Sequence, residues 1–109
     1  MSTKKPSIKQ LEYFVTIAHS TNFRKAAAKL GVSQPTLTSQ IAVMEEILGV
    51  QLFERSRAGT LLSPEGRDLL SLARDILDQY QHLLDTAQNS NRELGGTFRI
   101  GVSSTVGPY

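Results

Sequence analysis

The segment from Ser33 to Ala42, SQPTLTSQIA, carries side chains that could recognise a polar surface by hydrogen bonding. The face of this predicted helix without large apolar residues consists of Pro35, Thr38, Ser39 and Ala42, flanked by Gln34 and Gln40. A solvated face normally carries Lys and Glu, because they combine helix propensity with strong hydration. Amides and hydroxyls can instead pair with base edges, and small apolar side chains can contact thymine methyls. The alternative is a small polar helix packed beneath another element.

The other reactive side chains do not form a pattern typical of catalysis. His19 and His82 lie on different predicted helices, and isolated histidines are usually surface or packing residues. Asp75 and Asp78 share a helix face, which is more typical of solvated charge than of a metal site. The chain contains no cysteine and no phosphate loop, zinc spacing or nucleophile motif. We therefore expect neither an enzyme nor a metal or cofactor site.

Composition and charge are those of a small soluble protein with one basic half. The 109 residues are 39% hydrophobic and 20% charged, which suits one small domain. The sequence has no apolar run near the roughly 18 residues of a membrane span, so we expect a cytoplasmic protein without a membrane partner. Residues 1–63 carry eight basic against four acidic residues, and residues 64–109 carry four against six. The first half, at +4, would favour a phosphate backbone.

Three helices are predicted before residue 50. Ser7, with Gln10 three residues later, forms a capping box ahead of an amphipathic helix. Asn22 begins a second, short helix that Gly31 ends. Ser33 then caps a third helix, with Pro35 in its first turn. Two helices joined by such a short glycine turn indicate a helix-turn-helix.

A small hairpin and a long helix are predicted next. The third helix buries a stripe of Leu37, Ile41, Met44 and Leu48 and ends at Gly49. Short apolar runs at Leu52–Phe53 and Leu61–Leu62 flank a turn through Arg57–Thr60, which predicts a two-stranded wing. Ser63 caps a fourth helix that starts at Pro64. The expected fold is mainly α: a winged helix-turn-helix of three helices and a two-stranded wing, followed by a long dimerisation helix.

The fourth helix carries a heptad seam. Its apolar positions step by four and three residues: Leu69, Ala73, Ile76, Tyr80, Leu83 and Ala87. Leu70, Leu77 and Leu84 widen this stripe. Packing on the chain's own wing domain could cover the first turns but not a helix reaching residue 90. The seam therefore predicts a homodimer.

Residues 8–70 resemble the winged helix-turn-helix of LysR-type transcriptional regulators. The matching stretches are LEYFVTIAHSTNFRKAAAKLGVSQPTLTSQI, MEEILGVQLFER and LLSPEG. The resemblance implies a bacterial-type regulator that binds interrupted palindromic double-stranded operator DNA as a dimer. It also implies a higher oligomer for the full-length protein, and a small-molecule or redox effector bound by a C-terminal domain.

The resemblance also assigns DNA-binding residues. Base and phosphate contacts are expected from Ser33, Gln34, Pro35, Thr38, Ser39 and the wing arginines, Arg55 and Arg57. Many family members have arginine where this chain has Ser39, and often again at Ala42. Phosphate anchoring should therefore fall more heavily on basic residues of the first two helices, such as Arg24 and Lys25, and on the wing.

The last residues look like the opening of a further domain. TFRIGV alternates like a strand, so we expect the sequence to stop inside a longer protein. TVGPY resembles the peroxide-sensing branch of the family, and Ser103, Ser104 and Thr105 would match a ligand-contacting loop. The expected division is a DNA-binding domain (1–63), a linker helix (64–91), and a hinge with the first strand of an effector domain (92–109). The alternative function is a helical protein-interaction and dimerisation module.

Overall fold

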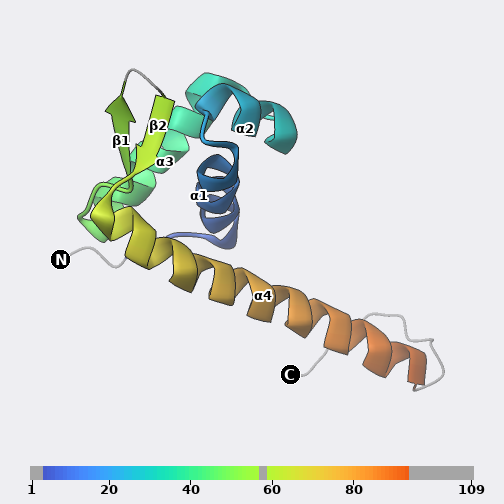
Figure 1. Ribbon diagram of the computed structural model, residues 1–109. Helices are drawn as coiled ribbons and strands as arrows, with labels where there is room; N and C mark the ends of the chain where they lie inside the picture. Colours follow the sequence, from blue (N-terminus) through green and yellow to red (C-terminus); the bar gives the residue numbers. More distant parts are fainter. Residues whose placement is uncertain (1–3, 57–58, 94–109) are drawn as a thin grey trace. The chain divides into compact units, whose positions relative to one another are not determined.

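Three short helices form the N-terminal part of the chain. The computed structural model describes residues 4–56 and 59–93. In it, α1 spans Ile8–Ser20, α2 Phe23–Leu30 and α3 Gln34–Leu48, and Figure 1 shows the three packed together. α2 and α3 are joined by three residues, so they form the predicted helix-turn-helix.

The ends of these helices are set by local side chains. The Ser7 hydroxyl accepts a hydrogen bond from the Gln10 backbone N–H, while the Gln10 side chain accepts one from the Ser7 N–H. Asn22 and Ser33 accept from the backbone N–H three residues ahead, which satisfies donors that lack a partner within the helix. Glycines in the left-handed region end the next two helices: Gly31 (φ 72°) and Gly49 (φ 76°). Each of these caps was predicted from the sequence.

The wing is a two-stranded antiparallel hairpin. β1 spans Phe53–Ser56 and β2 spans Gly59–Leu62, with Phe53 opposite Leu62 and Ser56 opposite Gly59. Arg55 pairs with Thr60. The prediction that Gly59 and Thr60 belong to the turn is therefore wrong, because backbone pairing extends beyond the short apolar runs that marked the strands.

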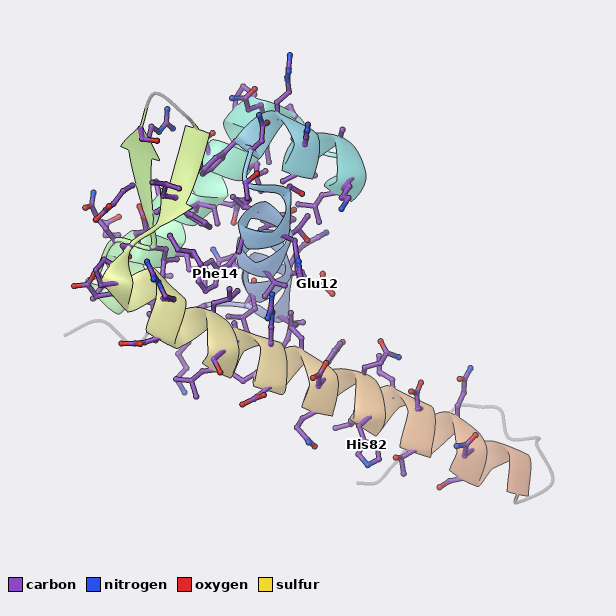
Figure 2. The ribbon with its side chains drawn as sticks, in the orientation of Figure 1. Glu12, Phe14 and His82 are labelled. Atoms are coloured by element: carbon purple, nitrogen blue, oxygen red, sulfur yellow. The ribbon has the colours of Figure 1, made fainter. Side chains whose placement is uncertain are left out.

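The hydrophobic core lies between the three helices, the base of the hairpin and the start of the fourth helix. Phe14 in α1 is fully buried, and Figure 2 shows it on the side of α1 that faces the hairpin, with Glu12 on the opposite side. The remaining large buried side chains come from α1, α3 and the start of the hairpin: Tyr13, Ile17, Leu37, Ile41, Met44, Leu52 and Phe53. α2 and α4 contribute buried alanines. This core fixes the orientation of α3 relative to α1, α2 and the hairpin.

Two details of the predicted packing differ in the structure. Leu48 was assigned to the buried stripe of α3, but it is 37% exposed, because the last turn of α3 extends past the elements that cover Met44. Ala73, which was assigned to the dimer seam, belongs to the core, and Leu69 and Leu70 pack against it. The first turns of the fourth helix therefore belong to the same core.

The fourth helix, α4, spans Pro64–Glu93. The chain divides into two compact units after Leu77, so the first unit contains α1, α2, α3, the hairpin and the first turns of α4. The second unit begins at Asp78 and contains the rest of α4. Ala73, in α4, is buried in the core of the first unit.

Candidate nucleic-acid interface

The first turns of α3 expose a neutral polar surface. Gln34, Pro35 and Ser39 are exposed and Thr38 is half-buried, while Leu37 on the opposite face is fully buried. Ala42 extends the exposed face by a further turn. This surface has no charged side chain and no large apolar one, so a polar partner could approach the helix backbone closely.

Two of the polar residues around this surface already have partners. The Ser33 hydroxyl donates to the Thr36 hydroxyl oxygen at 2.8 Å and accepts from the Thr36 backbone N–H at 3.2 Å. The Gln40 amide oxygen accepts from the Gln10 side chain at 3.1 Å. Gln40 therefore joins α3 to α1, and Ser33 mainly organises the start of α3. The exposed Thr36, beside the cap, was not singled out from the sequence.

A cleft of about 310 Å³ opens beside the start of α3. Its lining residues include Asn22, Phe23 and Arg24 at the start of α2, Gln34 at the start of α3, and Arg55 and Thr60 of the hairpin. Among the described residues that line it, two are cationic and none is acidic. The cleft therefore joins the three elements of the predicted interface and suits an anionic group.

The cationic side chains are placed by short-range structure. Arg24 and Lys25 lie in the first turn of α2, whose start is fixed by the Asn22 cap, and both are exposed. Arg55 lies in β1 opposite Thr60 and is also exposed. The guanidinium carbon of Arg55 lies 5.6 Å from the centroid of the Phe23 ring, within the range of a cation–π contact.

The hairpin is attached to α3 by a partly buried carboxylate. Glu45 Oε2 accepts from the backbone N–H groups of Leu52 at 2.8 Å and Phe53 at 3.4 Å. Hydrogen bonds to a carboxylate are stronger than bonds between neutral groups. Glu45 therefore orients the base of the wing relative to α3. The sequence pattern alone gave Glu45 no role, because its partners are backbone groups of another element.

A tight joint connects the hairpin to α4. The buried Ser63 hydroxyl donates to the Gln51 carbonyl and accepts from the Gly66 N–H at 2.8 Å, and the Ser63 N–H donates to the Leu52 carbonyl at 3.0 Å. A Cβ atom on Gly66 would lie 2.1 Å from the Leu52 carbonyl oxygen. The glycine is therefore needed for the close approach of α4 to the chain before β1.

The residues assigned to the dimer seam divide into two groups. Ala73 is 3% exposed and Leu69 is half-buried, and both belong to the core of the first unit. The others are exposed: Ile76 (47%) in the first unit, and Tyr80, Leu83 and Ala87 in the second. Leu72 and Leu84 are exposed as well. The division arises because the core of the first unit covers the first turns of α4 and not Ile76.

Several expectations lie outside the described residues or concern isolated groups. Arg57, Ser103, Ser104, Thr105 and the predicted strand after residue 94 lie outside the described ranges.

His19 Nε2 lies 3.0 Å from Arg74 Nη2, whereas His82 is exposed on α4 (Figure 2). Within residues 4–56 and 59–93, no three acidic or histidine side chains form a metal-binding group. No helix in that part of the chain could span a membrane.

Comparison with known proteins gives the class of this arrangement. Residues 8–67 match the model of the bacterial regulatory helix-turn-helix proteins of the lysR family. The chain belongs to that family, as the resemblance predicted. The predicted fold class, a winged helix-turn-helix followed by a long helix, is likewise confirmed.

Individual relatives agree with this classification. A probable hydrogen peroxide-inducible genes activator of Streptomyces viridosporus is 40% identical over 106 residues, which are 97% of this chain and 34% of that protein. The oxidized form of Corynebacterium glutamicum OxyR superposes with a TM-score of 0.78 at 40% identity, over 84% of this chain and 28% of that one. These names agree with the resemblance of TVGPY to the peroxide-sensing branch of the family. The chain spans about a third of the curated relatives it matches.

A structure of an isolated domain bears directly on the interface. The DNA complex of the CbnR DNA-binding domain superposes with a TM-score of 0.73 at 38% identity. The match covers 77% of this chain and 97% of that one. The part of the chain that carries the cleft and the polar face of α3 thus has the fold of a domain solved with DNA bound.

Proposed function

We propose that this chain binds specific sites in double-stranded DNA as a homodimer, with the first turns of α3 in the major groove and the wing on the backbone or in the adjacent minor groove. The observation that carries the proposal is the position of the basic cleft beside the neutral polar surface of α3. Base edges are read by polar and small apolar side chains, whereas phosphates are bound by Arg, Lys and backbone N–H groups. Here the two kinds of surface adjoin at Gln34, which belongs to both.

The proposed base contacts come from Gln34, Pro35, Thr38 and Ser39. The proposed phosphate contacts come from Arg24, Lys25, Arg55 and Arg57, with Ser33 ordering the start of α3. Ser39 stands where many family members have arginine, so recognition here relies on neutral hydrogen bonding on α3 and on cations beside it. The contacts of α3 would then determine which DNA sequence is preferred. The cationic side chains would add affinity for any DNA sequence, because phosphate contacts are independent of sequence.

The dimer is proposed to form through α4. Ile76, Tyr80 and Leu83 repeat at heptad spacing, and each is at least 40% exposed. Exposed apolar stripes of this kind mark interaction sites on soluble proteins. A symmetric pairing of two copies would cover the same side chains on both. Sedimentation of the chain as a dimer at micromolar concentration is the expected result.

The longer protein is proposed to be a non-enzymatic, cytoplasmic transcriptional regulator that responds to a small-molecule or redox effector. Relatives named as hydrogen peroxide-inducible genes activators support a peroxide-type signal. The 109 residues contain no cysteine, so they provide no thiol for such a response. The division into residues 1–63, 64–91 and 92–109, with Ser103, Ser104 and Thr105 in the effector domain, stays part of this proposal.

Selection of binding sites from random double-stranded DNA tests the DNA-binding proposal. The chain should enrich a pair of half-sites related by two-fold symmetry. Affinity for the selected site should exceed that for a shuffled sequence of the same length and composition. Both affinities should fall steeply with salt, by about 0.9 log units per log unit of salt for each phosphate contacted. An unenriched pool with salt-insensitive binding would instead favour the alternative, a helical protein-interaction and dimerisation module.

A further inference from the structure

The two arginines of the cleft differ in how they are held. The Arg55 side chain lies over the ring of Phe23, with the guanidinium carbon 5.6 Å from the ring centroid. Within residues 4–56 and 59–93, Arg24 forms no hydrogen bond, ion pair or ring contact through its side chain. An arginine side chain loses much rotamer freedom when it is fixed by a ligand. A side chain already held in the free protein loses less of this freedom on binding.

The ring that holds Arg55 is itself fixed to the core. The Phe23 and Phe53 rings lie edge to face, 5.8 Å apart with an interplanar angle of 73°. Phe53 in turn contacts Phe14 at 5.5 Å and 78°. Phe14 is fully buried and Phe53 nearly so. Phe23 also begins α2, directly after the Asn22 cap. A series of rings thus runs from the centre of the core to the cleft.

The contact leaves the hydrogen-bond donors of Arg55 available. A guanidinium has five N–H donors, and an aromatic face attracts its charge without using them as a carboxylate would. Arg24 and Gln34 line the same cleft, and none of its described lining residues is acidic. An anion that enters the cleft therefore meets a guanidinium that is held in place but not neutralised.

We propose that Phe23 is a positioning residue that holds the Arg55 guanidinium in the cleft for contact with one phosphate of the DNA backbone. This inference rests on the proposed DNA-binding function and adds a role for a residue that carries no charge and donates no hydrogen bond. Arg55 is then a prearranged phosphate contact. Arg24 binds without such support.

A double-mutant cycle on the 109-residue chain tests the proposal. Phe23→Leu, Arg55→Ala and the double variant are compared with the unchanged chain on the selected DNA site across a salt series. Arg55→Ala should reduce the salt slope by about 1. Phe23→Leu should weaken binding about two- to fivefold, the effect of an exposed cation–π contact. In the Arg55→Ala background, Phe23→Leu should have no further effect. Phe23→Tyr should recover most of the affinity lost in Phe23→Leu.

Arg24→Ala provides the matched cycle, because Arg24 lines the same cleft without a recorded contact to the ring. Its effect should add to that of Phe23→Leu. Equal losses from Phe23→Leu with and without Arg55 would overturn the proposal and assign Phe23 a merely structural role. Failure of Phe23→Tyr to bind better than Phe23→Leu would overturn it as well.

A measurement on the unchanged chain avoids the risk that a Phe23 variant unfolds. Nitrogen-15 relaxation of the arginine Nε–H groups in the absence of DNA should give a higher order parameter for Arg55 than for Arg24. Equal order parameters would contradict the proposal. Failure of the chain to bind DNA would contradict the proposed function. DNA binding with no coupling between Phe23 and Arg55 in the double-mutant cycle would contradict only this inference.

Discussion

The core residues of the first unit and the later turns of α4 differ in how far their apolar side chains are covered. In the first unit, Phe14, Ile17 and Leu37 are fully buried by elements of the same chain. From Ile76 onward, α4 exposes large apolar residues at heptad spacing, with Leu83 61% exposed. The first unit therefore has the core of an independently stable domain. The later part of α4 carries an exposed apolar heptad stripe of the kind that a second helix covers in a coiled-coil dimer.

This contrast separates two requirements of a DNA-binding regulator. Reading a half-site requires a surface whose geometry is fixed, which the core and the caps of α2 and α3 provide. Combining two half-sites requires an association between copies, which an uncovered helix face can provide. Variants that affect one requirement should leave the other nearly unchanged.

The largest effect is expected from Ile76→Glu, which places a carboxylate in the proposed seam. Burying an unpaired carboxylate costs several kcal/mol, so the subunits should separate. Affinity for the two-half-site operator should fall about a hundredfold or more, because the half-sites no longer bind as one ligand. The first unit should stay folded, because Ile76 is already 47% exposed. Analytical ultracentrifugation, circular dichroism and DNA titration measure the three outcomes.

Gln88→Glu is the matched control for Ile76→Glu, because it adds the same charge to an exposed position of α4 that lies away from the seam and its flanking e and g positions. It should remain dimeric. An Ile76→Glu variant that also remains dimeric at micromolar concentration would show that the seam does not join two copies.

The next effect concerns the joint between the hairpin and α4. Gly66→Ala puts a Cβ atom 2.1 Å from the Leu52 carbonyl oxygen, an overlap with backbone that a rotamer change cannot relieve. We expect a loss of roughly 3 kcal/mol in the free energy of unfolding, the upper end of typical overpacking costs. Gly49→Ala, at φ +76° with open space around it, should cost about 1 kcal/mol. Denaturant titration would compare the two, and equal losses would contradict the assigned close contact.

Smaller effects should follow from removing base contacts. Thr38→Ala and Gln34→Ala should each reduce the preference for the selected site by roughly 1–3 kcal/mol while leaving binding to shuffled DNA nearly intact. Ser71→Ala, at an exposed position of α4, serves as the control. Gel-shift titrations on the two DNAs give the ratio of affinities. Equal weakening of binding to both DNAs would show that the altered residue contacts the DNA backbone and not a base edge.

The smallest effect on specificity is expected from Arg24→Ala. Its guanidinium lines the cleft, so its loss should weaken binding to selected and shuffled DNA by the same factor and reduce the salt slope by about 1. Arg67→Ala removes an exposed arginine of α4 that does not line the cleft, and should leave the slope unchanged. An unchanged slope in Arg24→Ala would exclude Arg24 from the phosphate contacts.

Features decided by neighbouring residues were predictable from the sequence. Ser7, Asn22 and Ser33 cap their helices because each side chain bonds a backbone N–H three residues away. Gly31 and Gly49 end helices because they adopt a left-handed conformation without a Cβ penalty. The polar surface of α3 was equally predictable, because helical periodicity places Leu37 opposite it.

Features that depend on distant parts of the chain were not predictable in this way. The contact of Arg55 with Phe23 depends on how the hairpin packs beside α2, and no local pattern reports that packing. The inclusion of Ala73 in the core was missed because the heptad seam runs through it without interruption. Leu48 fits the apolar periodicity of α3 as well as Met44 does, but helix periodicity cannot say where the covering elements end.

The joint at Ser63 and Gly66 has a mechanical consequence. The Ser63 hydroxyl links the Gln51 carbonyl to the Gly66 N–H, and the Ser63 N–H bonds the Leu52 carbonyl directly. A side chain at Gly66 would not fit in this joint. The start of α4 therefore cannot turn against the residues that lead into β1 without breaking these hydrogen bonds.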